Sequence, residues 1–510
     1  MILNRDEYRS KVLGCWMGKN IGGTLGAPFE WRRQLNDVSF YTQELGGEPL
    51  PNDDLDIQLL WLVALEERGV EIDAKVLSEY WLIYVTPHWS EYGNAKANLR
   101  AGLLPPLSGS CNNDYKHSCG AFIRSEIWAC ITPGCPHAAA RYAYQDAILD
   151  HGDGEGTYGE VFTAALESAA FVETDVGKLI RIGLSYIPDG CGVAGAVRSA
   201  VNSHMLGRTW VQARDAILEE YRGGTFAGDI HHTSQRDREK GFHTGRQGWD
   251  VPSNIGLLML GLLYGEGDFD KTLCTTVNCG EDTDCTGATV GSLFGILHGI
   301  DAIPDRWIQP IGRKIKTLCL NLGDLGQVPR DVDDMTDRTE RIARQVIGRR
   351  HLPVEIADRP TDLSGLTDAS LLASDGGASL YAAPRGPVFR FDFFDVAVDY
   401  GEGPYIRDHV PKAIGITIRN HYRVQATVNV HWYAPEGWRV RPSADGTVFL
   451  SHGWLGGPKT LEFIVEAEQV RRPANRLVVE LTIDGRPLTM LVPITLLNGS
   501  LVPQGEEKQA

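Results

Sequence analysis

Two short acidic runs hold the residues of this chain that are best suited to chemistry. The first, residues 51–56, contains three aspartates and is followed by an apolar helical pattern. The second, residues 280–286, contains Glu281, Asp282 and Asp284 and is followed by a glycine-rich helical pattern. One carboxylate is enough to cap a helix N-terminus. Three carboxylates at each of two helix starts therefore indicate a further task.

That task is cation binding, provided that the two helix starts converge in the fold. Carboxylates brought together repel one another unless a cation lies between them. Oxygen ligands suit Mg²⁺, Mn²⁺ or Ca²⁺ rather than zinc, and the ten cysteines form no Cys-x-x-Cys pair of zinc type. Two ions about 3.5–4 Å apart would hold a water and a substrate oxygen. The sequence predicts a centre of two Mg²⁺ ions, with Mn²⁺ or Ca²⁺ as alternatives.

The overall charge argues against two classes of partner. The 66 acidic and 49 basic residues give a net charge of −17, so no basic face for nucleic acid or for an anionic membrane is expected. No run reaches the roughly 18 apolar residues of a membrane span. Residues 1–7 lack the charged-then-apolar layout of a signal peptide. We therefore expect a soluble, cytoplasmic protein.

The elements that must position the acidic runs belong to the first of two unlike halves. Apolar residues recur every three or four positions through residues 1–350, which predicts an all-α catalytic domain. Residues 351–384 are rich in Asp, Ser, Gly and Pro and are interpreted as a linker. Alternating residues over 385–498 predict a smaller all-β sandwich of immunoglobulin type, with a hairpin signal at Asp484-Gly485. Residues 499–510 are expected to form a disordered tail.

Two of the predicted helices carry glycine at every fourth position. These glycines are Gly14, Gly18, Gly22 and Gly26 in one helix, and Gly287, Gly291, Gly295 and Gly299 in the other. Each glycine inside a helix costs about 1 kcal/mol relative to alanine. A four-residue spacing places the glycines on one face, which predicts a closely packed central helix pair. Gly26, two residues before Pro28, is expected in a turn.

Four stretches within residues 1–345 share their order and spacing with the motifs of one family. They are residues 22–30, similar to Gly-Asp-x-x-Gly-x-x-x-Glu; residues 52–54, in the place of Thr-Asp-Asp; residues 134–159, similar to a Gly-x-Pro helix that ends in a histidine; and residues 282–288, similar to Asp-x-Asp-Thr before a helix of small residues. The chain thus resembles the ADP-ribosylglycohydrolase family. The β-rich half lies outside the family's usual domain.

The resemblance implies an all-α fold with a dinuclear magnesium site. It implies hydrolysis of the bond between ribose C1″ of ADP-ribose and a glycosylated protein or small-molecule acceptor. The implied metal ligands are Asn52, Asp53, Asp54, Asp282, Asp284 and Cys285. The implied substrate-binding residues are Gly120, Ala121, Arg124 and His151, and Glu30 would lie on a flap above the metals. Asp54 or Glu30 would take the proton of the attacking water.

The chain departs from the family pattern at four places. Gly23 replaces an aspartate, Asn52 and Cys285 each replace a threonine, and residues 118–121 lack a Gly-Asn-Gly sequence. A thiol is a poor partner for Mg²⁺, so we predict that Cys285 packs beside the metals as a small apolar group. The altered loop makes a glycoside without an ADP moiety the alternative substrate. A ligand-binding homologue without turnover is a third hypothesis, and the retained aspartates argue against it.

Overall fold

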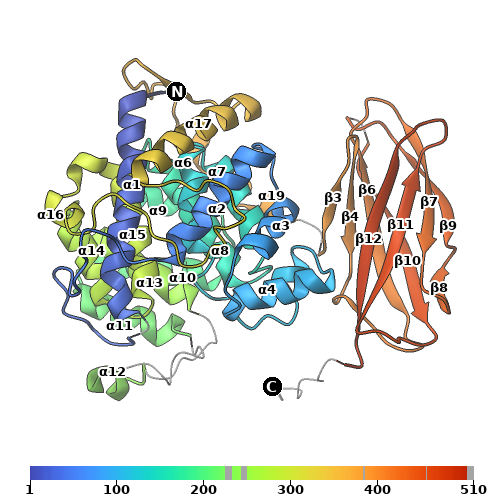
Figure 1. The fold of residues 1–510 in the computed structure, drawn as a ribbon, viewed down its shortest axis with the longest axis horizontal. Coiled ribbons are helices and arrows are strands. Elements are labelled where there is room, and N and C mark those ends of the chain that lie inside the picture. The colour runs from blue at the N-terminus through green and yellow to red at the C-terminus, as the bar shows by residue number, and fades with distance from the viewer. Residues whose placement is uncertain (31, 224–232, 243–249, 383–384, 455, 502–510) are drawn as a thin grey trace. The chain divides into compact units, whose positions relative to one another are not determined.

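The computed structural model describes residues 1–30, 32–223, 233–242, 250–382, 385–454 and 456–501. The chain forms two compact units, Met1–Lys96 with Asn112–Tyr381, and Ala97–Cys111 with Ala382–Ala510. The first unit is helical and the second is built mainly of strands (Figure 1). The predicted fold class, an all-α region followed by a smaller all-β region, is confirmed.

The helices of the first unit are short to medium in length. They are α1 (Arg5–Gly26), η1 (Ala27–Phe29), α2 (Asp53–Arg68), α3 (Ala74–Tyr84), α4 (Ser90–Ala101), η2 (Phe122–Arg124), α6 (Glu126–Cys130), α7 (Pro136–Ala147), α8 (Glu155–Ala169), α9 (Val176–Leu184), α10 (Gly192–Met205), α11 (Trp210–Tyr221), α12 (Gln235–Glu239), α13 (Val251–Tyr264), α14 (Phe269–Asn278), α15 (Thr283–His298), η3 (Ile300–Ala302), α16 (Asp305–Ile308), α17 (Val332–Arg350), α18 (Asp368–Leu371) and α19 (Ala378–Tyr381). Within the described ranges, no helix combines the length and apolar composition that crossing a membrane requires.

Helices α1 and α15 pack backbone to backbone in the first unit. They run antiparallel, because Gly14 faces Gly295 and Gly22 faces Gly287. A Cβ added at Gly18 would lie under 3.0 Å from the backbone carbonyl of the facing glycine of α15. The close helix pair predicted from the glycine spacing is therefore confirmed. The prediction is wrong for Gly299, which follows the last residue of α15 and has a positive φ of 78°.

The prediction of a turn at Gly26 is wrong. Gly26 is the last residue of α1 and has φ −74. A Cβ there would meet the backbone of Thr283, so the glycine contact extends to the end of the helix. Pro28 does not break α1, because it lies in the first turn of the following η1 helix, where its missing N–H is not needed.

The strands of the second unit form two sheets of five strands within the described residues. Their orders are β3 (Val388–Arg390), β4 (Phe394–Asp399), β6 (Lys412–Asn420), β10 (Lys459–Ala467) and β8 (Trp438–Arg441), and β5 (Tyr405–Ile406), β12 (Thr489–Asn498), β11 (Ala474–Thr482), β7 (Ala426–Tyr433) and β9 (Asp445–Leu450). Among the described strand pairs of these two sheets, β5–β12 is parallel and the others are antiparallel. Asp484-Gly485 lies between β11 and β12, which pair as the predicted hairpin.

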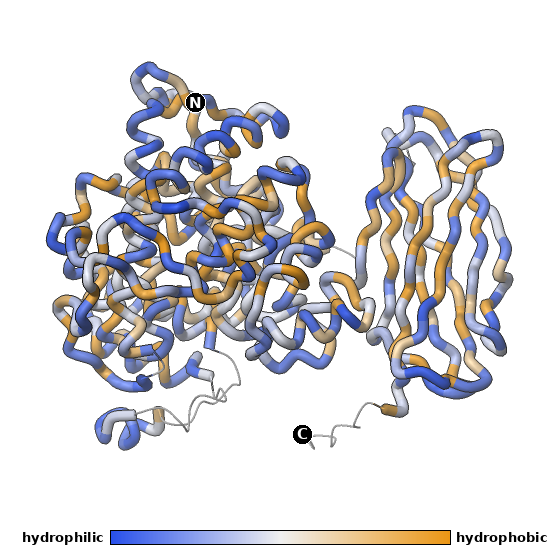
Figure 2. The backbone as a smooth tube through the Cα atoms, in the orientation of Figure 1, coloured by the Kyte–Doolittle hydropathy of each residue, from blue (hydrophilic) through white to orange (hydrophobic). Residues whose placement is uncertain are grey.

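Alternating side chains of both sheets meet in one apolar core. In β12, for example, Met490, Val492 and Ile494 are buried while Leu491 is exposed. Apolar stretches follow the strands in Figure 2, interrupted by hydrophilic residues. The strand β12 ends at Asn498, and residues 502–510 of the predicted tail lie outside the described residues.

A segment of the helical half belongs to the sandwich. Residues 97–111, which include the end of α4 and the whole of α5 (Leu107–Ser110), group with the strands. Leu103 and Leu107 are buried in the apolar core of the two sheets. The sequence pattern assigns this segment to the helical domain, because it lies between predicted helices. Its apolar spacing is equally compatible with packing against helices or against the two sheets. Periodicity identifies which residues are buried, and only the fold identifies what covers them.

Residues 351–384, interpreted as a linker, carry short elements of their own. The strand β2 (Glu355–Ala357) pairs in parallel with β1 (Ile2–Asn4), and α18 and α19 follow it. The first unit extends to Tyr381.

We expect a fragment of residues 1–350 to be poorly soluble although its helices are retained. The fragment leaves Leu103 and Leu107 without the sheets that bury them, and exposed apolar patches promote association. Replacing both leucines by serine in the fragment should restore solubility, which light scattering can measure beside helical circular dichroism. A soluble, monomeric unmodified fragment would contradict the expectation.

Candidate functional site

The two acidic runs meet where three helices end or begin. Because α1 and α15 are antiparallel, the end of α1 lies beside the start of α15, and Gly26 contacts Thr283. The start of α2 reaches the same place through its N-cap Asn52, whose Nδ2 lies 3.4 Å from Asp284 Oδ2. A Cβ at Gly23 would lie under 3.0 Å from the Asn52 amide. The glycine in the place of the family's aspartate therefore makes room for Asn52.

Five side chains gather there in two overlapping groups. Ligand atoms of Asp54, Asp284 and Cys285 lie within 4.8 Å of one another, and so do those of Glu30, Asp282 and Asp284. Asp284 belongs to both groups. The first group is buried, whereas Glu30 and Asp282 are partly exposed. The convergence on which the cation hypothesis depends is thus present in the fold.

Several carboxylate oxygens at this site lack hydrogen-bond partners among the described residues. Both oxygens of Asp54 and one oxygen each of Asp282 and Asp284 are buried and unpartnered in the described part of the chain. Buried polar atoms are nearly always paired in folded proteins, because leaving one unpaired costs about 1–3 kcal/mol. The four oxygens belong to the three aspartates of the two overlapping groups, and such oxygens are the donors that a hard divalent cation would satisfy.

Burial and mutual repulsion raise the pKa values of these carboxyl groups. Burial raises the pKa of Glu30 to about 10, with added repulsion from Asp284. Burial, with repulsion from Glu30, raises the pKa of Asp282 to about 8. Burial also holds the pKa values of Asp54 and Asp284 well above the usual range. Without a cation the site would therefore bind protons at neutral pH, and a bound cation would displace them.

Asn52 and Asp53 lie at the border of the two groups. The Asn52 oxygen accepts from the Asp54 backbone N–H at 2.7 Å, so it caps α2. Asp53 Oδ2 accepts from the Tyr92 hydroxyl at 3.1 Å. Asp53 belongs to neither group of acidic and thiol ligand atoms within 4.8 Å. The Asn52 amide contacts Asp284, whereas the charge of Asp53 adds to burial in raising the pKa of Asp54.

Cys285 lies in the first group as a buried thiol. Burial, and after it the neighbouring Asp282 carboxylate, raise its pKa well above the usual range. A protonated thiol is a weak ligand for hard cations, because the thiolate is the binding form. Geometry alone would admit Cys285 as a ligand, but its chemistry favours a packing role.

We expect Cys285→Ser to keep the affinity for a divalent cation within about tenfold, or 1.4 kcal/mol. The serine hydroxyl fits the same volume, and the aspartate oxygens remain. Titration with Mn²⁺ followed by electron paramagnetic resonance can measure the change. Metal-to-sulfur coordination seen by X-ray absorption would contradict the prediction.

The four residues predicted to bind substrate lie in a separate buried network. Gly120 and Ala121 precede η2, and the Gly120 carbonyl accepts from Arg124 NH1 at 2.8 Å. The guanidinium of Arg124 also donates to Asp146 and Asp150. Arg124 has no exposed surface. A direct contact of Arg124 with a ligand is therefore not supported, and the guanidinium instead holds the loop carbonyl.

His151 is equally enclosed. Its Nδ1 lies 2.8 Å from Asp150 Oδ1 and its Nε2 lies 3.2 Å from Ser118 Oγ. Burial alone would raise the pKa of Asp150, but Arg124 and His151 hold it below the usual range. The ring has no exposed surface, so His151 orients the loop at Ser118 and does not line an open cleft. The sequence motif identified His151 as a candidate but did not reveal that its ring pairs with the Asp150 carboxylate.

Sequence reasoning missed a buried lysine at the site. Lys19 Nζ donates to the Ile123 carbonyl at 2.6 Å and to Glu126 Oε1 at 2.7 Å, and it lies 3.8 Å from Asp54 Oδ1. It is the only charged residue between Gly14 and Gly26. A lone lysine in a helix that packs closely against another could have indicated a buried charge with an acidic partner. Lys19 supplies one positive charge beside a site with several carboxylates.

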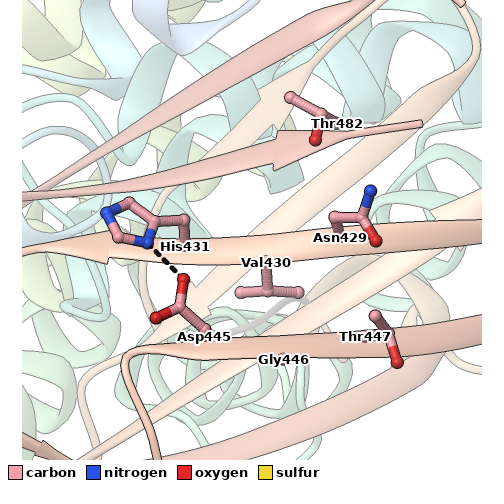
Figure 3. Close-up of a pocket in the computed structure, with 7 residues that line it drawn as sticks. All are labelled: Asn429, Val430, His431, Asp445, Gly446, Thr447 and Thr482. Atoms are coloured by element: carbon pink, nitrogen blue, oxygen red, sulfur yellow. Dashed lines mark hydrogen bonds and ion pairs between the residues drawn. The ribbon is translucent and has the colours of Figure 1, made fainter. Parts of the chain in front are cut away.

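A surface pocket lies on the sandwich. Figure 3 shows this pocket of about 450 Å³ on the outer surface of β7, β9 and β11. Its lining residues are Asn429, Val430, His431, Asp445, Gly446, Thr447 and Thr482. His431 Nδ1 and Asp445 Oδ1 already pair with each other at 2.6 Å. The pocket holds no group of acidic side chains comparable to the site at the helix ends.

The family of the helical region is decided by comparison with known proteins. The family model described as ADP-ribosylglycohydrolase matches residues 4–340. The chain belongs to the ADP-ribosylglycohydrolase family. The acidic groups and the paired glycine helices both lie inside the matched region.

Individual relatives are distant. An ADP-ribosyl-(dinitrogen reductase) glycohydrolase from Rhodospirillum rubrum is 22% identical over 320 residues, which are 61% of this chain and 93% of that protein. A solved ADP-ribosylglycohydrolase-related protein complex is 18% identical, covers 67% of this chain and 99% of its own, and has a TM-score of 0.42. A FixG-related protein from Vibrio parahaemolyticus matches 21% of this chain and 99% of its own, at 11% identity and a TM-score of 0.18.

Proposed function

We propose that this chain hydrolyses a glycosidic bond at the anomeric carbon of an ADP-ribosyl group, with the help of divalent cations. The observation that carries the proposal is the set of buried, unpartnered carboxylate oxygens on Asp54, Asp282 and Asp284. The set lies within the region matched by the ADP-ribosylglycohydrolase model. The Rhodospirillum rubrum relative, whose name states that it acts on ADP-ribosyl-(dinitrogen reductase), supports the substrate class.

The residues present fit a pair of Mg²⁺ ions, with Mn²⁺ or Ca²⁺ as alternatives. Asp54 and Asp284 would hold one ion, and Glu30, Asp282 and Asp284 would hold the other. Asp284 is the residue that could bridge them, because it belongs to both groups. Bound cations of this class lower the pKa of a water and polarise a substrate oxygen.

Glu30 is the carboxylate best placed to accept the proton of the attacking water. It is partly exposed, whereas Asp54 is enclosed beside Lys19. A nearby positive charge favours the ionised form of a carboxyl group, so an occupied site would lower the high pKa of Glu30. The neighbouring Asp282 and Asp284 would stabilise positive charge that develops at the anomeric carbon.

One observation favours a second substrate class, a glycoside without a diphosphate. Arg124 and His151 are fully buried and paired with Asp150. They therefore offer no free donor to the phosphates of an ADP moiety. The substrate loop also reads Ser118-Cys119-Gly120-Ala121 in place of Gly-Asn-Gly.

A substrate panel separates these functions. The full chain would be assayed on ADP-ribosylated proteins, on ADP-ribose derivatives and on aryl glycosides, each with Mg²⁺ and with a chelator. Release of ADP-ribose only in Mg²⁺ supports the proposal. Turnover of aryl glycosides alone supports the second class, and binding without turnover of any substrate would refute an enzymatic role.

We expect the chelated protein to lose stability as the pH rises from about 5 to about 9. Unfolded carboxyl groups titrate near pH 4, whereas the folded pKa values are about 8 for Asp282 and about 10 for Glu30. Between these limits the folded state binds more protons than the unfolded state, so raising the pH favours unfolding. Mg²⁺ at 100 times its dissociation constant should raise the free energy of unfolding by about 2.7 kcal/mol.

Differential scanning calorimetry in chelator and in Mg²⁺, at several pH values, can measure this dependence. The gain from Mg²⁺ should grow with pH, because fewer protons then compete for the carboxylates. A melting temperature in chelator that does not change over this range would contradict the prediction.

A further inference from the structure

Glu281 stands directly before Asp282 in a strained backbone position. Its φ is 70°, in the left-handed region where residues other than glycine are rare. The preceding Gly280 also has a positive φ of 77°. The Glu281 side chain is almost completely buried. A glycine would adopt this turn without strain, so the presence of a glutamate calls for a role of its side chain.

The Glu281 carboxylate is bound by two arginines from distant parts of the chain. Arg222 Nε donates to Oε1 at 3.0 Å, and Arg33 Nε lies 3.5 Å from Oε2. Arg33 also donates to the Gly223 carbonyl and to Asp250 Oδ1, each at 3.1 Å. The carboxylate thus joins the segment that follows Glu30, the end of α11 and the start of α13.

This cluster is maintained in spite of a second unfavourable feature. Nη1 and Nη2 of Arg222 are buried and have no hydrogen-bond partner among the residues that the structure describes. A buried guanidinium with unsatisfied donors is unfavourable, as is the left-handed backbone of Glu281. Strain of this kind persists mainly at functional sites, where the surrounding structure enforces it.

Backbone contacts transmit the position of Glu281 to the acidic site. The Glu281 N–H points to the Arg32 carbonyl at 3.4 Å, and a Cβ at Gly280 would lie under 3.0 Å from the Gln34 carbonyl. The segment that follows Glu30 therefore rests on the turn at residues 280–281. On the other side, the Asp282 N–H donates to Asn254 Oδ1 at 3.1 Å.

We propose that Glu281 is a positioning residue whose carboxylate, clamped by Arg33 and Arg222, holds Asp282 and Glu30 together around the cation. The role rests on the proposed function, since it presumes that these carboxylates bind a cation. Asp282 and Glu30 are the partly exposed members of the site. Each is joined through the backbone to the clamp, because Glu281 directly precedes Asp282 and its N–H contacts Arg32, two residues after Glu30.

Two substitutions separate the carboxylate from the backbone. Glu281→Gln keeps the shape of the side chain and removes the charge that binds the arginines. Glu281→Gly removes the side chain and relieves the left-handed strain. We expect both variants of the full chain to bind Mn²⁺ at least about tenfold more weakly than the natural chain, as is typical when a partner of a metal ligand is lost. Electron paramagnetic resonance measures the affinity without substrate.

Glu340 offers a matched control in the same domain. It is a buried glutamate bound by Arg5, Arg9 and Arg344. Its partner Arg9 lies far from the acidic site, because 17 residues of α1, or about 26 Å of helix, separate Arg9 from Gly26. Glu340→Gln should lower the melting temperature to a similar extent as Glu281→Gln and leave the Mn²⁺ affinity unchanged.

The outcomes distinguish the clamp from the centre that it serves. The clamp would be overturned if Glu281→Gly bound Mn²⁺ as tightly as the natural chain. The carboxylate would then have no effect on the site. An equal loss in Glu340→Gln would also overturn it, because general stability would explain the effect. A natural chain that binds no Mn²⁺ would refute the proposed centre itself, and with it this role.

Discussion

Leucine at position 291 should prevent the helical unit from folding stably. A Cβ alone at Gly291 would lie under 3.0 Å from the Gly18 carbonyl, which is backbone of the facing helix. Backbone cannot move aside as the end of a flexible side chain can, so α1 and α15 would have to separate along their whole contact. Overpacking in cores typically costs about 1–3 kcal/mol, and we expect this substitution to exceed the upper figure.

Alanine at the same position provides a graded comparison. Gly291→Ala adds only the clashing Cβ and should still destabilise the protein, although alanine is the better helix former by about 1 kcal/mol. Gly348→Ala is the control, because Gly348 lies in α17 with nothing within 4 Å of an added Cβ. That variant should gain stability. Chemical denaturation monitored by circular dichroism measures all three, and an unchanged midpoint in Gly291→Leu would contradict the close helix contact.

Asparagine at position 284 should abolish function and yet stabilise the metal-free protein. Asp284 belongs to both groups of candidate ligands, so its loss affects both ions. Loss of a metal-site partner commonly lowers affinity or activity 10–100-fold, and for a shared ligand we expect a loss of at least about 100-fold. Burial, with repulsion from Asp282 and Asp53, raises the pKa of Asp284 well above its usual range. The metal-free protein must therefore keep this group protonated at neutral pH, a cost that the neutral amide avoids.

The opposite signs of these two effects make the test specific. Asp284→Asn should melt at a higher temperature than the natural chain in chelator and should show no gain from Mg²⁺. Asp301→Asn, at an exposed position, should change neither property. A variant that lost activity through misfolding would instead melt at a lower temperature in chelator. Full activity of Asp284→Asn in Mg²⁺ would refute its place in the site.

The stability of this protein and its proposed activity thus make opposite demands on the same residues. Glu30 and Asp282 have pKa values of about 10 and about 8 because burial gathers them without compensating partners. Lys19 offsets only part of the charge, since Glu126 is its nearer partner. Sites that bind ligands commonly retain such unfavourable arrangements at a cost in stability.

Local patterns in the sequence predicted the helix starts and the paired glycines. The acidic runs predicted the N-termini of α2 and α15, because capping depends on residues only a few positions apart. The four-residue glycine spacing predicted the contact face of α1 and α15 for the same reason, since helix geometry fixes which residues share a face. Strand alternation likewise predicted the buried side of β12.

Partners far apart in sequence were decided by the tertiary structure alone. Arg124 and His151 could have faced a ligand, and the fold instead pairs both with Asp150. The prediction of a turn at Gly26 was wrong because α15 packs against α1 up to its last residue. The segment 97–111 joined the sandwich because its leucines pack against sheets formed some 300 residues later.

The sequence by itself determined the family and the two fold classes, and it supplied the candidate residues for a cation site. The tertiary structure decided which of those residues converge, which stay unpaired and which neighbours, such as Lys19 and Glu281, share the site. The physical reason is one of range. Periodicity, capping and residue chemistry act over a few positions, whereas hydrogen-bond partners, burial and pKa depend on packing between segments that the chain order does not place together.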